Sequence, residues 1–462
     1  MKKSIAIIGA GFSGLMTAVH LLKNASENIE ISLISPKENF ARGVAYKASS
    51  KHHLLNVPAG KMSAFQEKPT HFLDWLAQRE PYKNLEKNLL ATIFVPRNLY
   101  GDYLEELWTH TKQNAQSKIQ TLNDEVIDIE ELKNGTFELH LKQNQALQAD
   151  LVVLAVGNEA PKNPETLPEN VLRSALYFQD PWARDSIEQV ENLKNILLIG
   201  NGLTMVDVVS GLEERGFKGK IYSISPNGFQ ILPHRHNGIP YNNLLAEIPE
   251  NLDLGIIEWF SLFRKHIRFV RQFGISAEPV IDSIRSISPK IWQKLSLNDR
   301  KAFLRHLRHR WGVARHRLPV YVYDSIQEKQ RNGSLHIIKG KILDASLQNS
   351  KISLSYWDKK QHNEQNLLVD RVINCTGPNT DLRFSANSLL QNLFVKQMIE
   401  PDDLYLGIKA DQNGAIICQN KKYENFYTLG SALKGLFWES TAVPELRQQA
   451  ESLAKILLHL VN

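Results

Sequence analysis

The chain has 462 residues, a hydrophobic fraction of 42%, a charged fraction of 23% and a formal net charge of +6. At roughly 150 residues per domain this length predicts two or three domains. The modest positive charge suits anionic cofactors or substrates better than nucleic acid, and no apolar run approaches the roughly 18 residues of a membrane span. The two cysteines, Cys375 and Cys418, form no C-x-x-C pair, which argues against a disulfide reductase. We therefore expect a cytoplasmic protein without membrane or nucleic-acid partners.

The first element is a strand, a glycine turn and a helix between residues 4 and 22. Residues 5–8 form a β-branched apolar run, and residues 15–22 carry apolar side chains at helical spacing. Between them lies a G-x-G-x-x-G motif with glycines at Gly9, Gly11 and Gly14. In this context the motif predicts a dinucleotide pyrophosphate at the helix N-terminus. An ordinary glycine-rich turn is the alternative.

A second strand covers residues 29–35 and ends at Ser35, where a dinucleotide fold usually has an acid for the ribose hydroxyls. Segments 42–46, 52–63 and 69–75 follow, and glycine and proline interrupt any helical or strand pattern in them. A long loop of this kind either wraps a large cofactor or packs on its own side chains.

Four segments in this part of the chain match a known pattern. They are GAGFSGLMTAVHLL, RGVAY, HLLNVPAGKMSAF with PTHFLDWL, and FVPRNLYGDYL. Together they resemble the FAD/NAD(P)-binding family that includes flavin-dependent urate hydroxylase and aspartate N-oxygenating proteins. They are more distantly similar to ornithine and lysine N-hydroxylases and to flavin-containing monooxygenases. The resemblance implies FAD, contacted by Gly9, Gly11, Phe12, Ser13, Gly14, Ser35, Arg42, Asn56, Val57, Pro58, Met62, Arg97 and Val126.

The middle of the chain predicts a second nucleotide-binding unit. Segments 124–130 and 135–141 alternate as an antiparallel ribbon, and strand 150–157 ends at Gly157, where the chain is expected to leave the first domain. The strand 196–199 then leads to Gly200 and Gly202, followed by Leu203 and Thr204 at a helix start. This turn predicts a second dinucleotide site, with an ordinary βα crossover as the alternative. The next strand ends at residues 225–227 without the arginine of an NADP site or the acid of an NAD site, so NADPH and NADH both stay open.

The segment from 228 to 320 departs from α/β alternation. Residues 252–273 predict a packed helix, and a capping pair at Ser296 and Asp299 precedes a basic run from 300 to 317 in which Arg305 and His309 would share a helical face. Gly312 is expected to end that helix. The run is interpreted as lining an anionic cofactor or carboxylate substrate, with a solvated surface or a polyanion site as alternatives. It resembles the same family, except that Ala314 replaces a histidine. The candidate catalytic or anion-holding residues are Arg315, His316 and Arg317.

The C-terminal part predicts a return to the first domain. The strand 370–376 ends at Gly377, and the strand 426–429 ends at Gly430, where Ser431 replaces the usual aspartate. A helix is expected from about 442 to 460. Before it, Glu439 is a candidate near the flavin ring, with a plain surface acid as the alternative. We expect no metal site.

The predicted fold is α/β with two Rossmann-like dinucleotide-binding domains, the second inserted into the FAD-binding domain. The expected boundaries are 1–190, 191–340 and 341–462. By resemblance, the protein is an FAD-dependent oxidoreductase, most simply an NAD(P)H-dependent monooxygenase of a small nitrogenous or carboxylated substrate. The alternatives are an FAD-dependent reductase or dehydrogenase without oxygen insertion, and a non-catalytic FAD-binding interaction protein. The sequence leaves the substrate and the oligomeric state open.

Overall fold

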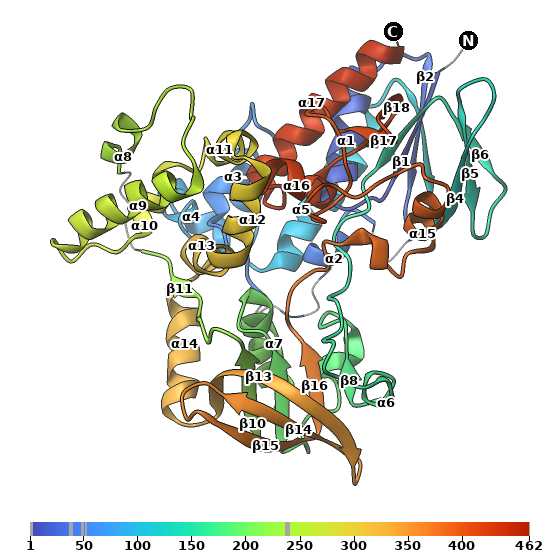
Figure 1. Ribbon diagram of the computed structural model, residues 1–462. Helices are drawn as coiled ribbons and strands as arrows, with labels where there is room; N and C mark the ends of the chain where they lie inside the picture. The colour runs from blue at the N-terminus through green and yellow to red at the C-terminus, as the bar shows by residue number, and fades with distance from the viewer. Residues whose placement is uncertain (1–2, 37–39, 48–49, 51–52, 236–240, 462) are drawn as a thin grey trace. The chain divides into compact units, whose positions relative to one another are not determined.

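The computed structural model describes residues 3–36, 40–47, 50, 53–235 and 241–461, and it divides the chain into two compact units (Figure 1). Unit 1 comprises residues 1–51, 57–159 and 379–462, and unit 2 comprises residues 52–56 and 160–378. The predicted boundaries lay at 190 and 340. The first boundary differs because residues 177–178 already form a strand in the sheet of unit 2, and the second differs because the strands between residues 335 and 374 complete that sheet. No described helix is long and apolar enough to cross a membrane.

Unit 1 is built on a six-stranded sheet in the order β17-β18-β7-β1-β2-β3. Its strands are parallel except for the β17–β18 pair. Their bounds are β1 (Lys3–Ile8), β2 (Ile29–Ile34), β3 (Lys118–Leu122), β7 (Leu151–Leu154), β17 (Ala415–Cys418) and β18 (Lys421–Thr428). The predicted first strand, with both faces buried, is confirmed as β1 in the middle of this sheet, since residues 5–8 are all buried.

Helices and a second sheet cover the two faces of this central sheet. Helix α1 (Phe12–Asn24) packs against both α5 (Arg97–Gln113) and α17 (Val443–Val461), and Figure 1 shows α1 and α17 side by side. On the other face, a shared core joins the sheet to the antiparallel strands β4 (Val126–Glu131), β5 (Phe137–Leu141) and β6 (Leu147–Ala149) and to α15 (Ser388–Val395). The shorter helices are α2 (Gly43–Tyr46), η2 (Ala59–Lys61), α3 (His71–Leu76), η3 (Tyr82–Asn84), α4 (Lys87–Leu90), η5 (Leu382–Phe384), η6 (Gly430–Leu433) and α16 (Lys434–Phe437).

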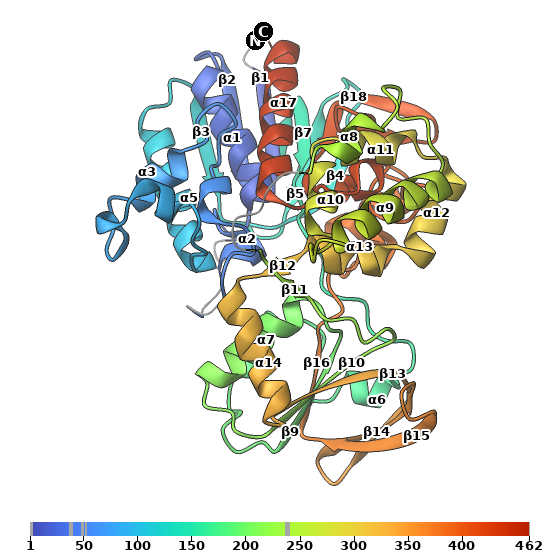
Figure 2. The ribbon, with the colours of Figure 1, turned by 90° about the vertical axis from the view of Figure 1, so that its left-hand side faces the viewer.

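Unit 2 is built on a seven-stranded sheet in the order β15-β14-β13-β10-β9-β16-β8. Strands β13, β14 and β15 are antiparallel and extend one side of it (Figure 2). One face packs on α7 (Leu203–Glu214) and α14 (Val320–Arg331), and the other on α6 (Glu169–Leu172). The strands are β8 (Tyr177–Phe178), β9 (Asn195–Ile199), β10 (Lys220–Ser225), β13 (Leu335–Gln348), β14 (Lys351–Asp358), β15 (Asn363–Val369) and β16 (Arg371–Asn374), and a short helix is η4 (Arg184–Ile187).

The rest of unit 2 is helical and contains the basic run. The predicted helix at 252–273 is confirmed as α9 (Ile256–Arg271), and Ser296 caps the next helix by accepting a hydrogen bond from the Asp299 N–H. The basic run is two helices, so Arg305 and His309 do not share one helical face, and the second helix continues past Gly312. The other bounds are α8 (Asn243–Ala246), α10 (Glu278–Ser283), α11 (Ser288–Lys294), α12 (Leu297–His306) and α13 (Arg308–Arg315), with the strand pair β11 (Leu232–Pro233) and β12 (Arg317–Leu318).

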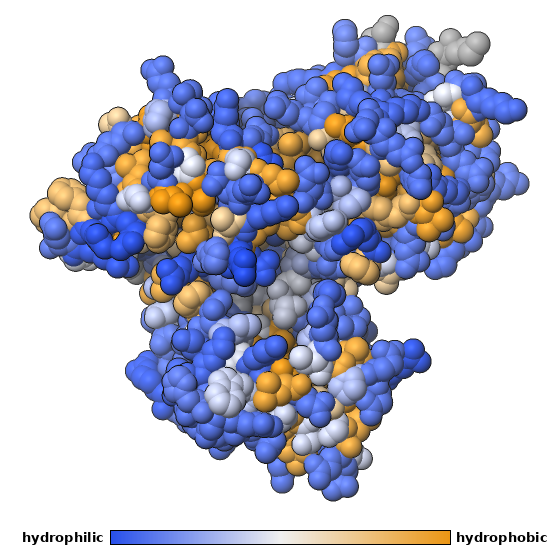
Figure 3. All heavy atoms as spheres, in the orientation of Figure 1, coloured by the Kyte–Doolittle hydropathy of each residue, from blue (hydrophilic) through white to orange (hydrophobic). Residues whose placement is uncertain are grey.

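The molecular surface is mostly hydrophilic on the face seen in Figure 3, with apolar side chains scattered in small groups. The large buried side chains lie inside the units, for example Phe72 and Phe137 in unit 1 and Ile326 in unit 2. Apolar burial of this kind is the main favourable term in folding each unit.

Candidate nucleotide-binding sites

The first glycine turn is so tight that it excludes side chains. Gly9 has φ +102°, and a Cβ added there would lie 2.2 Å from the Ala155 carbonyl oxygen. A Cβ on Gly14 would lie 1.9 Å from the Gly9 carbonyl oxygen. Both distances are far below van der Waals contact, so these positions require glycine if α1 is to start directly above β1. The sequence motif therefore has its predicted structural context.

The N-terminus of α1 has no side-chain cap among the described residues. Gly11 is the N-cap residue, and the first turn carries no acidic side chain. Gly11 also lies close to Gly43, because a Cβ on Gly43 would be 3.2 Å from the Gly11 Cα. An uncapped helix start next to two glycines leaves N–H groups and a positive dipole end available to an anion.

Three glycine turns of unit 1 meet at the carboxyl edge of the parallel strands. Gly9, Gly157 and Gly430 follow β1, β7 and β18, which are neighbours in the sheet, and all three have positive φ. Ser431 Oγ donates to the Gly157 carbonyl at 2.5 Å, and a Cβ on Gly430 would lie 2.9 Å from Ser13 Oγ. The structure thus brings together four predicted site residues that are up to 421 positions apart in the chain, from Gly9 to Gly430. In open parallel sheets, ligands bind outside this edge.

Ser35 lies at this edge, directly after β2, and Val126 lies in the three-stranded sheet β4-β5-β6. Ser35 follows β2, is buried, and donates its N–H to the Leu122 carbonyl at 3.1 Å. Val126 begins β4 and is also buried. Their predicted contacts with the adenosine part of FAD stay predictions.

The loop from 57 to 66 is held in place by hydrogen bonds from other elements. The Ala59 N–H donates to the Ile93 carbonyl at 2.9 Å and the Gly60 N–H to the Ala91 carbonyl at 3.0 Å. From α17, Arg447 Nη1 donates to the Ser63 carbonyl at 2.9 Å and Arg447 Nε to Gln66 Oε1 at 3.1 Å. Val57, Pro58 and the buried Met62 therefore lie on a loop fixed from outside. This role of Arg447 could not be predicted from the sequence, because the contact spans 384 residues.

His53 and Asn56, which precede this loop in the chain, belong to unit 2 and contact other residues of that unit. The Asn56 carbonyl lies 3.0 Å from His234 Nε2, and buried His53 lies 3.0 Å from the Asp207 carbonyl through Nε2. These contacts give His53 a structural role. His52, the first residue of the predicted segment 52–63, lies outside the described residues.

Arg42 joins α2 to α5. Its guanidinium donates to Asp102 at 2.5 Å, to Glu105 at 2.6 and 2.7 Å, and to the Asn98 carbonyl at 3.0 Å. The hydrogen bond to Glu105, the strongest influence, raises the pKa of Arg42 although burial opposes it. The contacts seen for Arg42 are therefore structural, and its flavin contact stays a prediction, as does that of Arg97, the first residue of α5.

The glycine turn of unit 2 follows the same plan with a looser fit. Gly200 has φ +112°, and a Cβ there would lie 2.6 Å from the Cys375 carbonyl oxygen, whereas a Cβ on Gly202 meets no described atom within 4 Å. Gly202 is the N-cap of α7, which Leu203 and Thr204 begin, and no described side chain caps it. Gly377, with φ +89°, follows the neighbouring strand β16. This edge can accept a dinucleotide as the first one can.

Asn201 is a residue of this turn that the motif did not single out. It is 7% exposed, and its Oδ1 accepts a hydrogen bond from Ser223 Oγ at 2.6 Å. Its buried Nδ2 has no hydrogen-bond partner among the described residues. A buried donor of this kind next to an uncapped helix is a feature that a bound phosphate or ribose would satisfy. Nearby Cys375 is buried, and burial raises the pKa of its thiol, so it is a core residue.

The predicted anion-holding residues have different environments. Arg317 is 4% exposed and its Nη1 lies 2.7 Å from both Glu278 Oε1 and Asp282 Oδ2. Arg315 Nη1 lies 4.0 Å from Asp282 Oδ1, and His316 is exposed at the end of α13. The guanidinium of Arg317 is therefore neutralised within unit 2, and its contacts do not support a substrate-holding role. That role stays a prediction for Arg315 and His316.

Glu439 follows a strained turn in unit 1. Trp438 has φ +59° and ψ −56°, and the Glu439 N–H donates to the Phe437 carbonyl at 2.6 Å. This is a γ-turn in its less stable form. Lys434 Nζ lies 5.3 Å from the centre of the Trp438 ring and supports it. Strain of this kind is often found near functional sites, which supports keeping Glu439 as a candidate.

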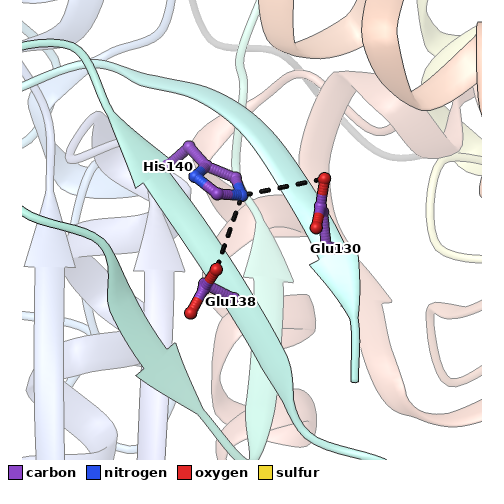
Figure 4. Close-up of side chains that lie close together, drawn as sticks. All are labelled: Glu130, Glu138 and His140. Carbon is purple, nitrogen blue, oxygen red and sulfur yellow. Dashed lines mark ion pairs between the residues drawn. The ribbon is translucent and has the colours of Figure 1, made fainter. Parts of the chain in front are cut away.

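One group of side chains in unit 1 has metal-binding chemistry (Figure 4). Glu130 and Glu138 face each other across β4 and β5, and His140 Nε2 lies 3.9 and 3.7 Å from their carboxylates. However, Lys396 Nζ already lies 3.2 Å from Glu130 Oε1, and the three side chains are 30 to 51% exposed. Because the chain supplies its own cation here, we assign no metal to this group.

Comparison with known proteins agrees with this geometry. Residues 6–159, a third of the chain, match the profile of the family described as FAD-NAD(P)-binding. No curated protein matches the sequence.

Three solved structures cover the whole chain at low identity. They are an ornithine N-hydroxylase from Kutzneria sp. 744 (13% identity, 99% of its length, TM-score 0.67), the ornithine hydroxylase of Pseudomonas aeruginosa (14%, 100%, 0.68) and L-lysine 6-monooxygenase from Pseudomonas syringae (15%, 100%, 0.67). The chain thus has the two-domain Rossmann-type fold of these proteins, and its N-terminal third carries an FAD-NAD(P)-binding sequence pattern.

Proposed function

We propose that this protein is an FAD-dependent oxidoreductase that takes electrons from NADPH or NADH, and that it acts as a monooxygenase on a small nitrogenous or carboxylated molecule. The observation that carries the proposal is the meeting of Gly9, Gly157 and Gly430 in front of the uncapped N-terminus of α1. This is a backbone cradle that side chains would fill. The match of residues 6–159 to an FAD-NAD(P)-binding profile supports it.

The residues present fit FAD. The N–H groups around Gly11, Ser13 and Gly14 would hold the pyrophosphate, Ser35 would contact the ribose, and the loop from 57 to 62 would lie along the ring system. When bound, FAD supplies the electron transfer and the oxygen chemistry. The chain supplies the positioning of the cofactor, the N–H donors and the exclusion of water.

The monooxygenase proposal is supported by likeness to hydroxylases of ornithine and lysine over the whole chain. It is also supported by the state of the cysteines. Cys375 and Cys418 are both buried, and burial raises both thiol pKa values, so neither is suited to exchange with a disulfide substrate.

A reductase without oxygen insertion is the second candidate. The ion pairs of Arg317 with Glu278 and Asp282 favour it, because they remove one of the predicted contacts to a substrate anion. The two candidates differ in how the reduced flavin reacts with oxygen.

The test uses purified full-length protein reconstituted with FAD. We expect a yellow protein whose flavin is bleached anaerobically by NADPH or NADH. On admitting air, oxygen consumption should rise when the correct small amine or amino acid from a panel is present, with formation of a hydroxylated product. Reoxidation that no substrate alters would favour the reductase. Protein that stays colourless with added FAD would contradict the whole proposal.

A further inference from the structure

The loop that follows β10 in unit 2 is placed to recognise the ribose of a dinucleotide. In Rossmann-type folds the end of the second strand faces the adenosine ribose, where an acid binds the free hydroxyls of NADH and a cationic side chain binds the 2′-phosphate of NADPH. Here that strand ends at Ser225, and the loop continues to Gly228. The sequence has no aspartate or glutamate between Glu214 and Glu247, so the acid for a free ribose is absent from this stretch.

Two lysines from distant parts of the chain contact this loop. Lys339 on β13 is the register partner of Ser225, and a Cβ on Gly228 would lie 2.8 Å from the Lys339 Cβ and 3.2 Å from its Cγ. Lys359 Nζ donates to the Pro226 carbonyl at 2.8 Å. The two lysines are joined through their backbones, since the Lys359 N–H donates to the Lys339 carbonyl at 2.9 Å. Both side chains are exposed and therefore open to a ligand.

The acid next to Lys359 in the chain is occupied by backbone N–H groups. The nearest acid on β14, Asp358, is 8% exposed, and its Oδ1 accepts hydrogen bonds from the N–H groups of Lys360 at 2.7 Å and Gln361 at 3.0 Å. Ser225 Oγ accepts from the Gly228 N–H at 3.1 Å, so its own hydrogen is free to be donated. A phosphate group accepts hydrogen bonds from hydroxyl and ammonium donors, whereas a ribose diol needs an acceptor as well.

We propose that Lys339, Lys359 and the Ser225 hydroxyl form a subsite for a phosphomonoester, and that this subsite makes the protein select NADPH over NADH. The inference rests on the proposed function, because it assumes that a nicotinamide dinucleotide binds at the glycine turn of unit 2. Sequence inspection of the β10 region misses the subsite, since both lysines lie more than a hundred residues after Ser225.

The test compares adenosine nucleotides by calorimetry on the full-length, FAD-reconstituted protein, so that binding is read without turnover. We expect 2′,5′-ADP to bind at least about tenfold more tightly than 5′-ADP, and the difference to shrink as salt is raised. The double variant Lys339→Ala with Lys359→Ala should lose most of this difference while keeping its affinity for 5′-ADP. Lys341→Ala is the matched control, because Lys341 is exposed on the same strand opposite Trp357, and it should bind like the wild type.

Three results would overturn the inference. They are equal binding of 2′,5′-ADP and 5′-ADP by the wild-type protein, an unchanged preference in a folded double variant, and tighter binding of 3′,5′-ADP, which would assign the subsite to a different phosphomonoester. The outcome is separable from that of the proposed function. Equal bleaching of the flavin by NADH and NADPH would refute the proposed subsite and leave the proposed oxidoreductase function standing. Selective 2′,5′-ADP binding by a protein that never takes up FAD would support the subsite and refute the proposed function.

Discussion

Replacing Arg447 by methionine tests whether α17 holds the loop at 57–66 in the shape that FAD needs. The substitution keeps an apolar stem and removes the donors to the Ser63 carbonyl and to Gln66. Hydrogen bonds to charged groups contribute about 1.5 to 3 kcal/mol each, and an exposed one contributes much less. Ser63 is fully buried, so we assign about 2 kcal/mol to its bond and little to that of Gln66. If the loop must be ordered to bind FAD, this loss raises the Kd for FAD by up to about 30-fold.

The assay is a titration of FAD-free Arg447→Met protein with FAD, followed by fluorescence quenching, together with amide hydrogen exchange of residues 57–66. We expect weaker FAD binding and faster exchange in this loop, with partial recovery in Arg447→Lys, which keeps the charge and loses the planar fork. Lys455→Met is the control, since it removes an exposed ion pair with Glu451 on the same helix. A folded Arg447→Met protein that binds FAD within threefold of the wild type, with unchanged exchange, would refute the reasoning.

Four further substitutions test other parts of the structure. Gly14→Ala should abolish FAD binding, because its Cβ would lie 1.9 Å from a carbonyl oxygen, whereas Gly202→Ala meets no described atom within 4 Å and should leave the melting temperature within a few degrees of the wild type. Arg317→Met should destabilise unit 2 by about 3 kcal/mol or more in urea unfolding, because it removes the cation paired with Glu278 and leaves Asp282 with only Arg315 Nη1 at 4.0 Å; an effect on substrate KM alone would show that the residue acts in binding. Burial raises the pKa of Asp150, but hydrogen bonds from Lys3 and Ser4 outweigh it and lower that pKa, so the bonds of Asp150 stabilise the fold above about pH 4 and this contribution is lost as pH falls through the lowered pKa. Asp150→Asn should therefore be less stable than the wild type at pH 7 and nearly equal to it at pH 2 to 3; the same deficit at both values would contradict the assignment.

Structural features that depend only on residues close together in the chain could be predicted from the sequence. Strand β1, the turn at Gly9 and helix α1 are encoded within 22 consecutive positions, and the second turn at Gly200 is encoded in the same local way. The cap at Ser296 was also predictable, because both partners lie within one helical turn.

The side-chain partners of the predicted site could not be read in this way. Arg317 was expected to hold a substrate anion because it lies in a basic run. Its acidic partners, Glu278 and Asp282, lie on a separate helix 39 and 35 residues earlier, so the sequence does not show that they pair with it. The break between α12 and α13 at Leu307 has no glycine or proline to announce it, and it separates Arg305 from His309. Such contacts depend on tertiary packing, which overrides local propensity.

The points at which the chain leaves and re-enters unit 1 are direct neighbours. Glu159 and Asn379 form an antiparallel bridge, and Ser385 Oγ donates to Glu159 Oε2 at 2.5 Å just beyond it. Paired residues of this kind have Cα atoms about 5 Å apart. Residues 160–378, 219 in all, are thus inserted between two paired residues of unit 1. Because the ends of the insertion are close together, its length adds little to the conformational entropy lost when unit 1 folds. A shortened gene that joins residue 159 to residue 379 through two or three glycines should therefore still yield a folded, FAD-retaining core.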